Sequence, residues 1–317
     1  MKKKKKPYNQ LIWHGRNNNM TSIADFIKIS KKDKHNNLDL GMRYSSYTLW
    51  SGFYIPDFPE DGICYEKDQQ NEIKQYTQIR VDSKKDIKNL LSLSISELVA
   101  DNVSEVDGTI NCNLIKCTET PEYFVEIIRE IQDKYSNQIK INPVLAIDTD
   151  SLDHTSLILA ETLLGSQEFS GIHFYGKDFS VNADKYKIFA ETAKEHNLTI
   201  KFSASDFSSE NELYHAYKQI LPNCIINGEN LINNDSFLSD LKNNNTSLII
   251  TPNTSTKLLS PWKEKANHLK LFMDKNIKVS LGTEGILFLN KSISEFAMEL
   301  CNCEIFTKDE IINLIKN

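Results

Sequence analysis

The feature that most constrains the fold of this chain is a regular alternation of two hydrophobic periods. Short β-rich runs are separated by stretches whose apolar residues recur every three or four positions. Eight β-rich runs occur, at 8–13, 108–117, 139–147, 170–175, 198–204, 223–227, 247–252 and 277–282. Strands that alternate with helices predict parallel βαβ units, and eight of them in 317 residues predict an α/β fold, a closed (β/α)8 TIM-type barrel. A doubly wound open sheet is the alternative.

The stretches between these runs predict helices, most clearly at 121–135. Pro121 suits the first helical position, because its missing N–H would have no partner there in any case. Phe124, Ile128 and Ile131 recur at the spacing of one buried helix face. The same pattern predicts further helices at 182–197, 210–220, 235–245 and 261–276.

The predicted domain organisation is one barrel domain over 1–317, preceded by a basic tail at 1–7. The extra length falls between the first and second predicted strands, at 20–105, where two helical patterns flank an aromatic-rich segment at 45–65. Loops that follow barrel strands lie on the face that carries active sites. We therefore expect this N-terminal helical insertion to cover the barrel mouth as a lid, or to present a surface to a partner.

Composition excludes several classes of function. The formal net charge of −6 and the isoelectric point near 5.7 argue against a nucleic-acid-binding protein, which needs a basic face. A mean hydropathy of −0.42 and the lack of a long apolar run predict no membrane span. The six cysteines include no C-x-x-C pair, which favours reduced thiols and a cytoplasmic protein.

Polar motifs follow the predicted strands, where a barrel would carry its site. They read LIWHGRN after the first strand, then IHFYGKD, KFSASDF, IINGEN, IITPNTS and SLGTEGI after strands four to eight. In this order and at these separations they resemble the adenosine/AMP deaminase family of the metal-dependent amidohydrolases. The corresponding family motifs are L-H-x-H-L-D-G, D-L-x-G, H-A-G-E, G-H-G, C-P-x-S-N and N-T-D-D-P. The resemblance spans the chain from Lys6 to the C-terminus, and each motif is partly kept.

The resemblance implies a zinc site that this chain has largely lost. In the family, three histidines and an aspartate hold zinc, which activates water for attack on a purine ring. Carried over, the two histidine positions of strand one are Ile12 and His14, the strand-five histidine is Ser203, and the ligand aspartate is Glu284. Catalytic zinc needs at least three protein ligands. The two that remain, His14 and Glu284, are too few, so we expect no metal.

The resemblance also implies that the proton-transfer groups are replaced. Asp206 stands where the family has the glutamate that protonates the ring, Asn227 replaces a water-orienting histidine, and Gly285 replaces the second aspartate. Gly176 matches the substrate-facing glycine after strand four, and Gly228 matches the last glycine of G-H-G. These two glycines and Asp206 are therefore the candidates for contact with a purine nucleoside or nucleotide.

One further acidic run follows the third predicted strand, at 148–154. Asp148, Asp150, Asp153 and His154 are concentrated there and could bind a cation. Capping of the next helix by Asp150 or Ser151 explains the same residues with fewer assumptions.

Three functional hypotheses follow. The preferred one is a catalytically inactive deaminase-like barrel, a pseudoenzyme that acts as a regulatory or scaffolding subunit, associates with a protein partner or itself, and still binds a purine. The second is an active hydrolase or purine deaminase with a rebuilt site, the only case in which zinc is expected as a cofactor. The third is a purely structural interaction protein with a filled pocket.

Overall fold

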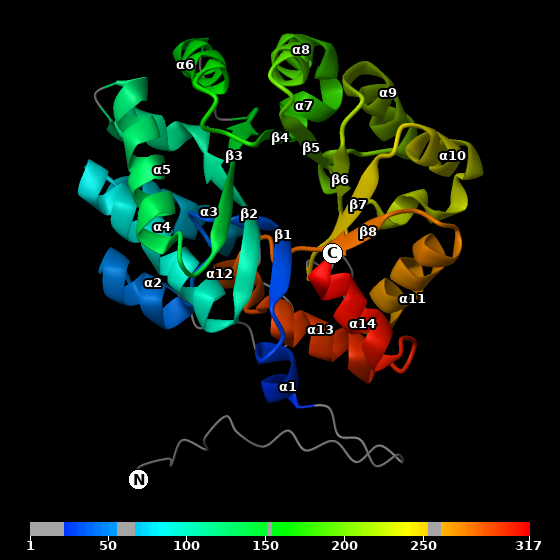
Figure 1. The fold of residues 1–317 in the computed structure, drawn as a ribbon. Coiled ribbons are helices and arrows are strands. Elements are labelled where there is room, and N and C mark those ends of the chain that lie inside the picture. The colour runs from blue at the N-terminus through cyan, green and yellow to red at the C-terminus, as the bar shows by residue number, and fades with distance from the viewer. Residues whose placement is uncertain (1–21, 56–66, 119, 151–153, 253–260) are drawn as a thin grey trace.

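The computed structural model describes residues 22–55, 67–118, 120–150, 154–252 and 261–317. Eight parallel strands form one sheet in sequential order (Figure 1). They are β1 (Lys31–Asn37), β2 (Val103–Asn111), β3 (Lys140–Asp148), β4 (Gly171–Tyr175), β5 (Thr199–Ser203), β6 (Cys224–Ile226), β7 (Ser247–Ile250) and β8 (Val279–Leu281). The N–H of Glu284, just after β8, donates to the carbonyl of His35 in β1 over 2.7 Å. This contact draws the first and last strands together, and the predicted (β/α)8 barrel is confirmed.

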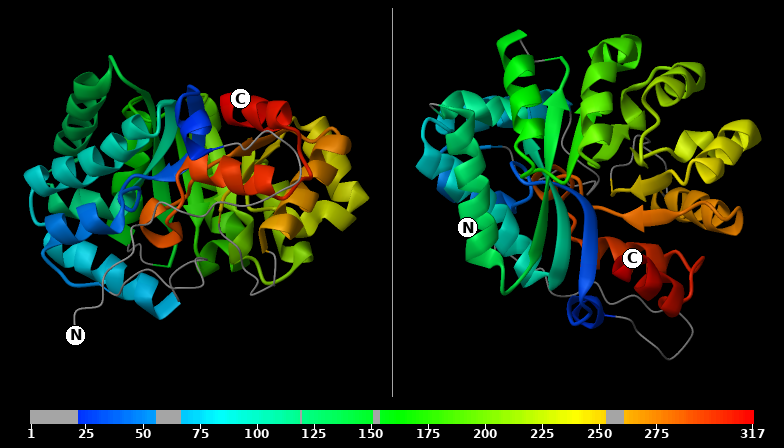
Figure 2. Two further views of the ribbon diagram at one scale, coloured as in Figure 1. Left: turned by 90° about the horizontal axis from the view of Figure 1, so that it is seen from below. Right: turned by 45° about the horizontal axis from the view of Figure 1, so that its top comes forward.

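Helices surround the strands on the outside of the barrel (Figures 1 and 2). Those between β1 and β4 are α2 (Tyr44–Ser51), α3 (Lys67–Arg80), α4 (Lys84–Ala100), α5 (Pro121–Tyr135) and α6 (His154–Gly165). Those beyond β4 are α7 (Lys177–Val181), α8 (Lys187–Glu195), α9 (Glu210–Ile220), α10 (Asp235–Asn243), α11 (Pro261–Asp274), α12 (Ile286–Leu289), α13 (Ile293–Asn302) and α14 (Lys308–Lys316). A short α1 (Ile23–Ile27) precedes β1 and packs on α13. No helix in the described residues is long and apolar enough to cross a membrane.

Two helices match the sequence prediction residue for residue, and α5 shows why. The Thr120 side chain accepts the N–H of Tyr123 and caps the first turn, while Pro121 follows as the first helical residue. Phe124, Ile128 and Ile131 then form the buried face. The second such helix, α9, begins after Ser209, whose hydroxyl accepts the N–H of Glu212. Capping residue and apolar period agree in both helices.

The prediction of the first strand was wrong. Residues 8–13 lie outside the described residues, and the sheet begins instead with β1, inside the range expected to be an insertion. Its sequence, KKDKHNN, contains no apolar residue, so no hydrophobic period marks it. Lys31, Asp33 and His35 are nevertheless buried, and Lys31 Nζ donates to the carbonyl of Asp101. Hydrogen bonds take the place of apolar packing in this strand.

The chain between β1 and β2 partly fulfils its expected role as a lid. Gln70, Lys74 and Thr77 of α3 line a cavity at the barrel mouth, together with Phe288 of α12. Both helices lie toward the same end of the barrel in Figure 2. In contrast, α4 packs against α5 and β2 on the barrel wall. Of the helices predicted in this segment, one is therefore part of the wall, and the covering helix α3 was not predicted.

The floor of the barrel interior is polar but paired. Lys201 of β5 is fully buried, and its ammonium group donates to Asp107 Oδ2 on β2 and to the carbonyl of Lys34 on β1, each over 2.8 Å. Burial tends to raise the pKa of Asp107, but Lys201 and Asn142 lower it overall. This cross-barrel ion pair links three strands below the mouth.

Candidate functional site

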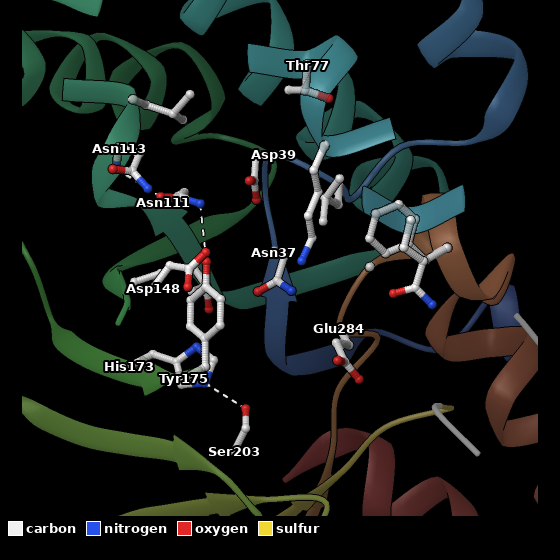
Figure 3. Close-up of a pocket in the computed structure, with 18 of the residues that line it drawn as sticks. Asn37, Asp39, Thr77, Asn111, Asn113, Asp148, His173, Tyr175, Ser203 and Glu284 are labelled. Atoms are coloured by element: carbon white, nitrogen blue, oxygen red, sulfur yellow. Dashed lines mark hydrogen bonds between the residues drawn. The ribbon is translucent and has the colours of Figure 1, made fainter. Parts of the chain in front are cut away.

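The carboxyl ends of the strands surround a cavity of about 600 Å³. This volume is within the range of pockets that bind small molecules. Strand ends β1 to β5 and the turn after β8 supply its polar lining, while α3 and α12 contribute from above. The polar side chains include His35, Asn37, Asp39, Asn111, Asn113, Asp148, His173, Tyr175, Ser203, Asp206 and Glu284, most of which Figure 3 labels.

The corrected position of β1 changes two of the expected zinc-ligand positions. Along β1 the motif H-x-H-L-D reads His35, Asn36, Asn37, Leu38 and Asp39. Ile12 and His14, to which these positions were assigned from the sequence, lie outside the described residues. The first ligand position is thus a histidine and the second an asparagine. The letters H, L and D in this order were the available signal, and the absence of an apolar run concealed it.

Two neutral imidazoles lie deep in the cavity. His35 and His173 pack edge to face, with ring centroids 4.8 Å apart. His35 Nδ1 is 3.2 Å from the hydroxyl of Thr109. Burial lowers the pKa of His35 well below its usual value, and burial lowers that of His173 to about 3, with the charge of Lys201 acting in the same direction on both. Both rings therefore carry no charge at neutral pH.

His173 also contacts the hydroxyl of Ser203, which the motif resemblance aligns with a zinc-ligand histidine. Its Nε2 lies 3.0 Å from Ser203 Oγ, as the dashed line in Figure 3 shows. His173 occupies the first position of D-L-x-G but was not predicted as a site residue. A serine and a histidine at this distance resemble a nucleophile and its base. However, the low pKa makes His173 a weak base, and its Nδ1 has no hydrogen-bond partner among the described residues to orient it.

Glu284 is held in the wall of the cavity by its neighbours. It lies in the left-handed backbone region, with φ of +60°. Its carboxylate accepts the Thr251 hydroxyl over 2.7 Å and the Asn227 side-chain amide over 3.4 Å. Burial raises the pKa of Glu284 despite the opposing hydrogen bond from Thr251. Asn227 thus supports Glu284, and the adjacent Gly285 lines the cavity without offering a side chain.

The predicted ligand contacts are only partly brought together. Asp206 Oδ2 accepts the N–H of Gly176 over 3.0 Å, so a ligand must displace Asp206 to reach that N–H. Gly176 has φ of +110°, and a Cβ there would meet Thr149 Oγ1 at 2.6 Å, so glycine is required. Neither Gly176 nor Gly228 is among the residues that line the cavity. A Cβ on Gly228 would meet the side chains of Leu231 and Leu248, each at 3.2 Å, which indicates a packing role.

Carboxylates gather around the phenol of Tyr175. Burial raises the pKa of Tyr175 well above its usual value, and the charges of Asp148, Asp39 and Asp206 raise it further. Asn111 donates its side-chain amide to the same hydroxyl over 3.2 Å (Figure 3). Burial also raises the pKa of Asp39 to about 6, with Asp148 adding to the effect. The mouth of the cavity is therefore rich in negative charge.

The acidic run at 148–154 divides between the cavity and a helix start. Asp148 lines the cavity, while Asp150 Oδ1 accepts the N–H of Asp178 over 2.8 Å in the first turn of α7. The side chains of Asp153 and His154 lie outside the described residues. Asp150 therefore has the capping role that was the alternative to cation binding, although for α7 and not for the next helix.

The donor set does not fit the zinc site implied by the sequence motifs. The residues at the four ligand positions are His35, Asn37, Ser203 and Glu284. Only the imidazole and the carboxylate are good zinc ligands; a neutral amide and a neutral hydroxyl are not. Among the residues that the structure describes, no group of three or more His, Cys, Asp or Glu side chains is arranged to hold a metal.

The chain is similar in sequence to a putative deaminase and in fold to a deaminase and an amidohydrolase of known structure. No protein-family profile matches the chain. A putative adenosine/adenine deaminase of Treponema pallidum is 24% identical over 295 residues, which cover 91% of this chain and 97% of that protein. The apo structure of the N6-methyl-AMP deaminase of Arabidopsis thaliana superposes with a TM-score of 0.74 at 13% identity, covering 93% and 92% of the two chains. An amidohydrolase of Burkholderia ambifaria with bound zinc gives 0.65 at 11% identity, covering 94% and 92%.

Proposed function

Because the chain resembles the adenosine/AMP deaminase family of the metal-dependent amidohydrolases over nearly its whole length, we propose that it binds a purine in the barrel mouth but does not deaminate it. The observation that carries this proposal is the set of residues at the zinc positions. Asn37 and Ser203 stand where the family motifs have histidines, on two different strands. Restoring one ligand from a neighbour would still leave the other absent.

The chemistry of deamination supports inactivity. In the family, bound zinc lowers the pKa of a water molecule so that it attacks the purine at neutral pH. The groups that would orient that water are missing as well, since the amide of Asn227 supports Glu284 and Gly285 has no side chain. Asp206, in the position of the proton donor, already accepts the N–H of Gly176. Activation and orientation of the water therefore lack groups that they need, and the proton donor is replaced by a shorter carboxylic acid that contacts Gly176.

The cavity itself supports retention of a ligand. A filled pocket would favour the purely structural hypothesis, whereas about 600 Å³ of space remains between the strand ends and α3. Side-chain amides of Asn37, Asn111 and Asn113 line it, and such groups can donate to and accept from the edge of a purine. A protein that binds a ligand without converting it can have an effect only as the ligand-bound protein. We propose that the ligand-bound protein regulates a protein partner or its own self-association.

The rebuilt-enzyme hypothesis has one observation in its favour, the contact between Ser203 and His173. The nucleophile would have to be activated by an imidazole whose pKa is about 3, and such a weak base withdraws a proton from a hydroxyl poorly at neutral pH. A metal-free hydrolase with this pair is therefore the second candidate.

Zinc content and restored ligands test the first proposal. The purified wild-type protein should carry well under one zinc per chain by elemental analysis and release no ammonia from adenine, adenosine, AMP or N6-methyl-AMP. The double variant Asn37→His/Ser203→His should gain zinc, because it returns imidazoles to the two positions that lost them.

A matched control places two histidines elsewhere in the same cavity. The variant Asn113→His/Ser205→His changes the same residue types at lining positions outside the ligand set and should not gain zinc. Stoichiometric zinc in the wild type, or ammonia release that Glu284→Ala abolishes, would overturn the proposal. Metal-independent ester or amide hydrolysis that Ser203→Ala abolishes would favour the second candidate.

A further inference from the structure

We propose that the cavity selects a purine that carries a positive charge and no phosphate group. This inference rests on the proposed purine binding and names the class of ligand. It draws on the balance of charge in the lining, which purine binding alone does not specify. Four of the lining side chains are carboxylates and two are lysines. The carboxylates are Asp39, Asp148, Asp206 and Glu284, and the lysines are Lys74 and Lys116.

The four carboxylates act on one another across the cavity. Burial raises the pKa of Asp39, Asp206 and Glu284. The charge of Asp148 adds to the increase for the two aspartates, and the charge of Asp206 adds to that for Glu284. These groups come from the ends of β1, β3, β5 and β8, so their charges converge from different sides of the barrel. Figure 3 shows Asp39, Asp148 and Glu284 around the open space. Like charges brought together in a partly desolvated space favour a bound cation.

Lys74 of α3 does not make the mouth of the cavity a phosphate-binding site. Lys74 lines the same cavity as Asp39 and Asp206. Burial raises the pKa of both carboxyl groups, and the charge of Lys74 opposes this increase only in part. A nucleotide phosphate at this position would add negative charge beside them. Phosphate sites in proteins instead gather several cationic or N–H donors around the oxygens. A nucleoside or free base avoids this repulsion.

Aromatic rings at the same cavity favour a flat cation. Tyr175 and Phe288 both line the cavity, from β4 and α12. A positive charge over an aromatic face gains electrostatic attraction, and more so where water is excluded. Burial raises the pKa of the Tyr175 hydroxyl, and the charges of Asp148, Asp39 and Asp206 raise it further. A purine nucleoside methylated on a ring nitrogen, so that the ring is positively charged, has the required shape and charge.

Two isomeric ligands isolate the effect of charge. 1-Methyladenosine is positively charged at neutral pH, whereas N6-methyladenosine contains the same added methyl group and is neutral. In calorimetric titrations of the full chain at pH 7.5 and low salt, 1-methyladenosine should bind about tenfold or more tightly than N6-methyladenosine and adenosine. AMP should bind more weakly than adenosine. Raising the salt concentration should reduce the preference for the cation, because ions screen charge.

Variants locate the preference in the cavity. Asp39→Asn and Asp148→Asn should each reduce the ratio of the two affinities severalfold, by weakening the binding of 1-methyladenosine. The control variant Glu195→Gln removes a carboxylate from the exposed side of α8 and should leave the ratio unchanged. A ratio that responds equally to all three variants would contradict a local effect of the cavity.

The outcomes separate this inference from the proposed function. Binding of adenosine without a preference for 1-methyladenosine, or tighter binding of AMP, would overturn the inference and leave purine binding intact. Binding of 1-methylpyridinium as tight as that of 1-methyladenosine, with none of adenosine, would support selection of cations and overturn purine binding. No binding of any of these ligands at millimolar concentration would overturn both.

Discussion

The floor and the mouth of the barrel interior both contain buried or half-buried charges. The charges are paired on the floor and unbalanced at the mouth. On the floor, Lys201 and Asp107 form an ion pair with 2.8 Å between the charged atoms. At the mouth, carboxylates outnumber lysines, and the pKa of Asp39 is raised to about 6. The charges on the floor are paired with each other within the folded chain and need no ligand. The carboxylates at the mouth repel one another until a ligand is bound. Such repulsion is expected at a site where ligand binding is favoured at the expense of the stability of the free protein.

The largest expected effect comes from removing one partner of the ion pair on the floor of the barrel. Lys201→Met removes the fully buried ammonium group and leaves Asp107 without its cation. Loss of one partner of a buried pair costs about 3–5 kcal/mol, because the remaining charge stays desolvated. Urea denaturation followed by circular dichroism should show this loss in the free energy of unfolding.

The double variant Lys201→Met/Asp107→Leu is its control. It removes both charges and should recover most of the lost stability, since apolar groups of similar volume can replace a buried ion pair. A single variant that loses less than about 1 kcal/mol would show that the pair contributes little, contrary to the contrast between floor and mouth.

A smaller effect of opposite sign is expected at the mouth. The pKa of Asp39 is raised from 3.8 to about 6 on folding, mainly by burial and also by the charge of Asp148. The folded state therefore binds the proton more tightly than the unfolded state. Its contribution to stability is fully present below pH 3.8 and is lost as the pH rises through 6. Asp39→Asn, which cannot ionise, should then stabilise the chain at pH 7.5 by about 1–2 kcal/mol, a value reduced for the partial exposure of Asp39.

Comparison of two pH values isolates this effect. At pH 4 the wild-type Asp39 is protonated in the folded state, so the stabilisation by Asp39→Asn should largely disappear. Lys74 of α3, Asp148 of β3 and Tyr175 of β4 line the same cavity as Asp39 and remain unchanged in the variant. Equal stability of variant and wild type at both pH values would show that the mouth carries no electrostatic strain.

The same contrast explains which parts of the molecule the sequence predicts. Outer helices such as α5 combine a capping residue with an apolar face, and both signals are local. Seven of the eight strands have apolar runs that mark them. The bounds of β3 to β8 agree with the prediction within two residues, whereas β2 begins five and ends six residues before its predicted bounds. The first strand has none, because Lys31, Asp33 and His35 fill its buried positions through hydrogen bonds to partners distant in sequence. Polar burial cannot be recognised without knowing the partner.

In the candidate site, too, some residues have a local sequence signal and others depend on partners distant in sequence. Ser203, Asp206, Gly285 and Glu284 line the cavity as the motif positions predict, because short motifs at strand ends fix their place in a barrel. His173 was missed, since a lone histidine inside an apolar run has no local signal of its contact with Ser203. The sequence assigned Gly228 to the ligand, yet two leucines surround it. The motif positions therefore locate four lining residues, whereas the two motif glycines, Gly176 and Gly228, are not part of the lining.

The smallest expected effect concerns the hydrogen bond between Asp206 and Gly176. In the free protein Asp206 Oδ2 accepts the Gly176 N–H over 3.0 Å, and a neutral ligand that uses this N–H must first displace the carboxylate. Asp206→Ala removes the competitor, so adenosine should bind about two- to threefold more tightly, which corresponds to roughly 0.5 kcal/mol. The same substitution removes one negative charge, so 1-methyladenosine should gain less or bind more weakly. Calorimetric titration of both ligands against the variant and the wild type measures the two changes together. Weaker binding of adenosine to the variant would show instead that Asp206 contacts the ligand directly, and that the mouth uses this carboxylate for recognition.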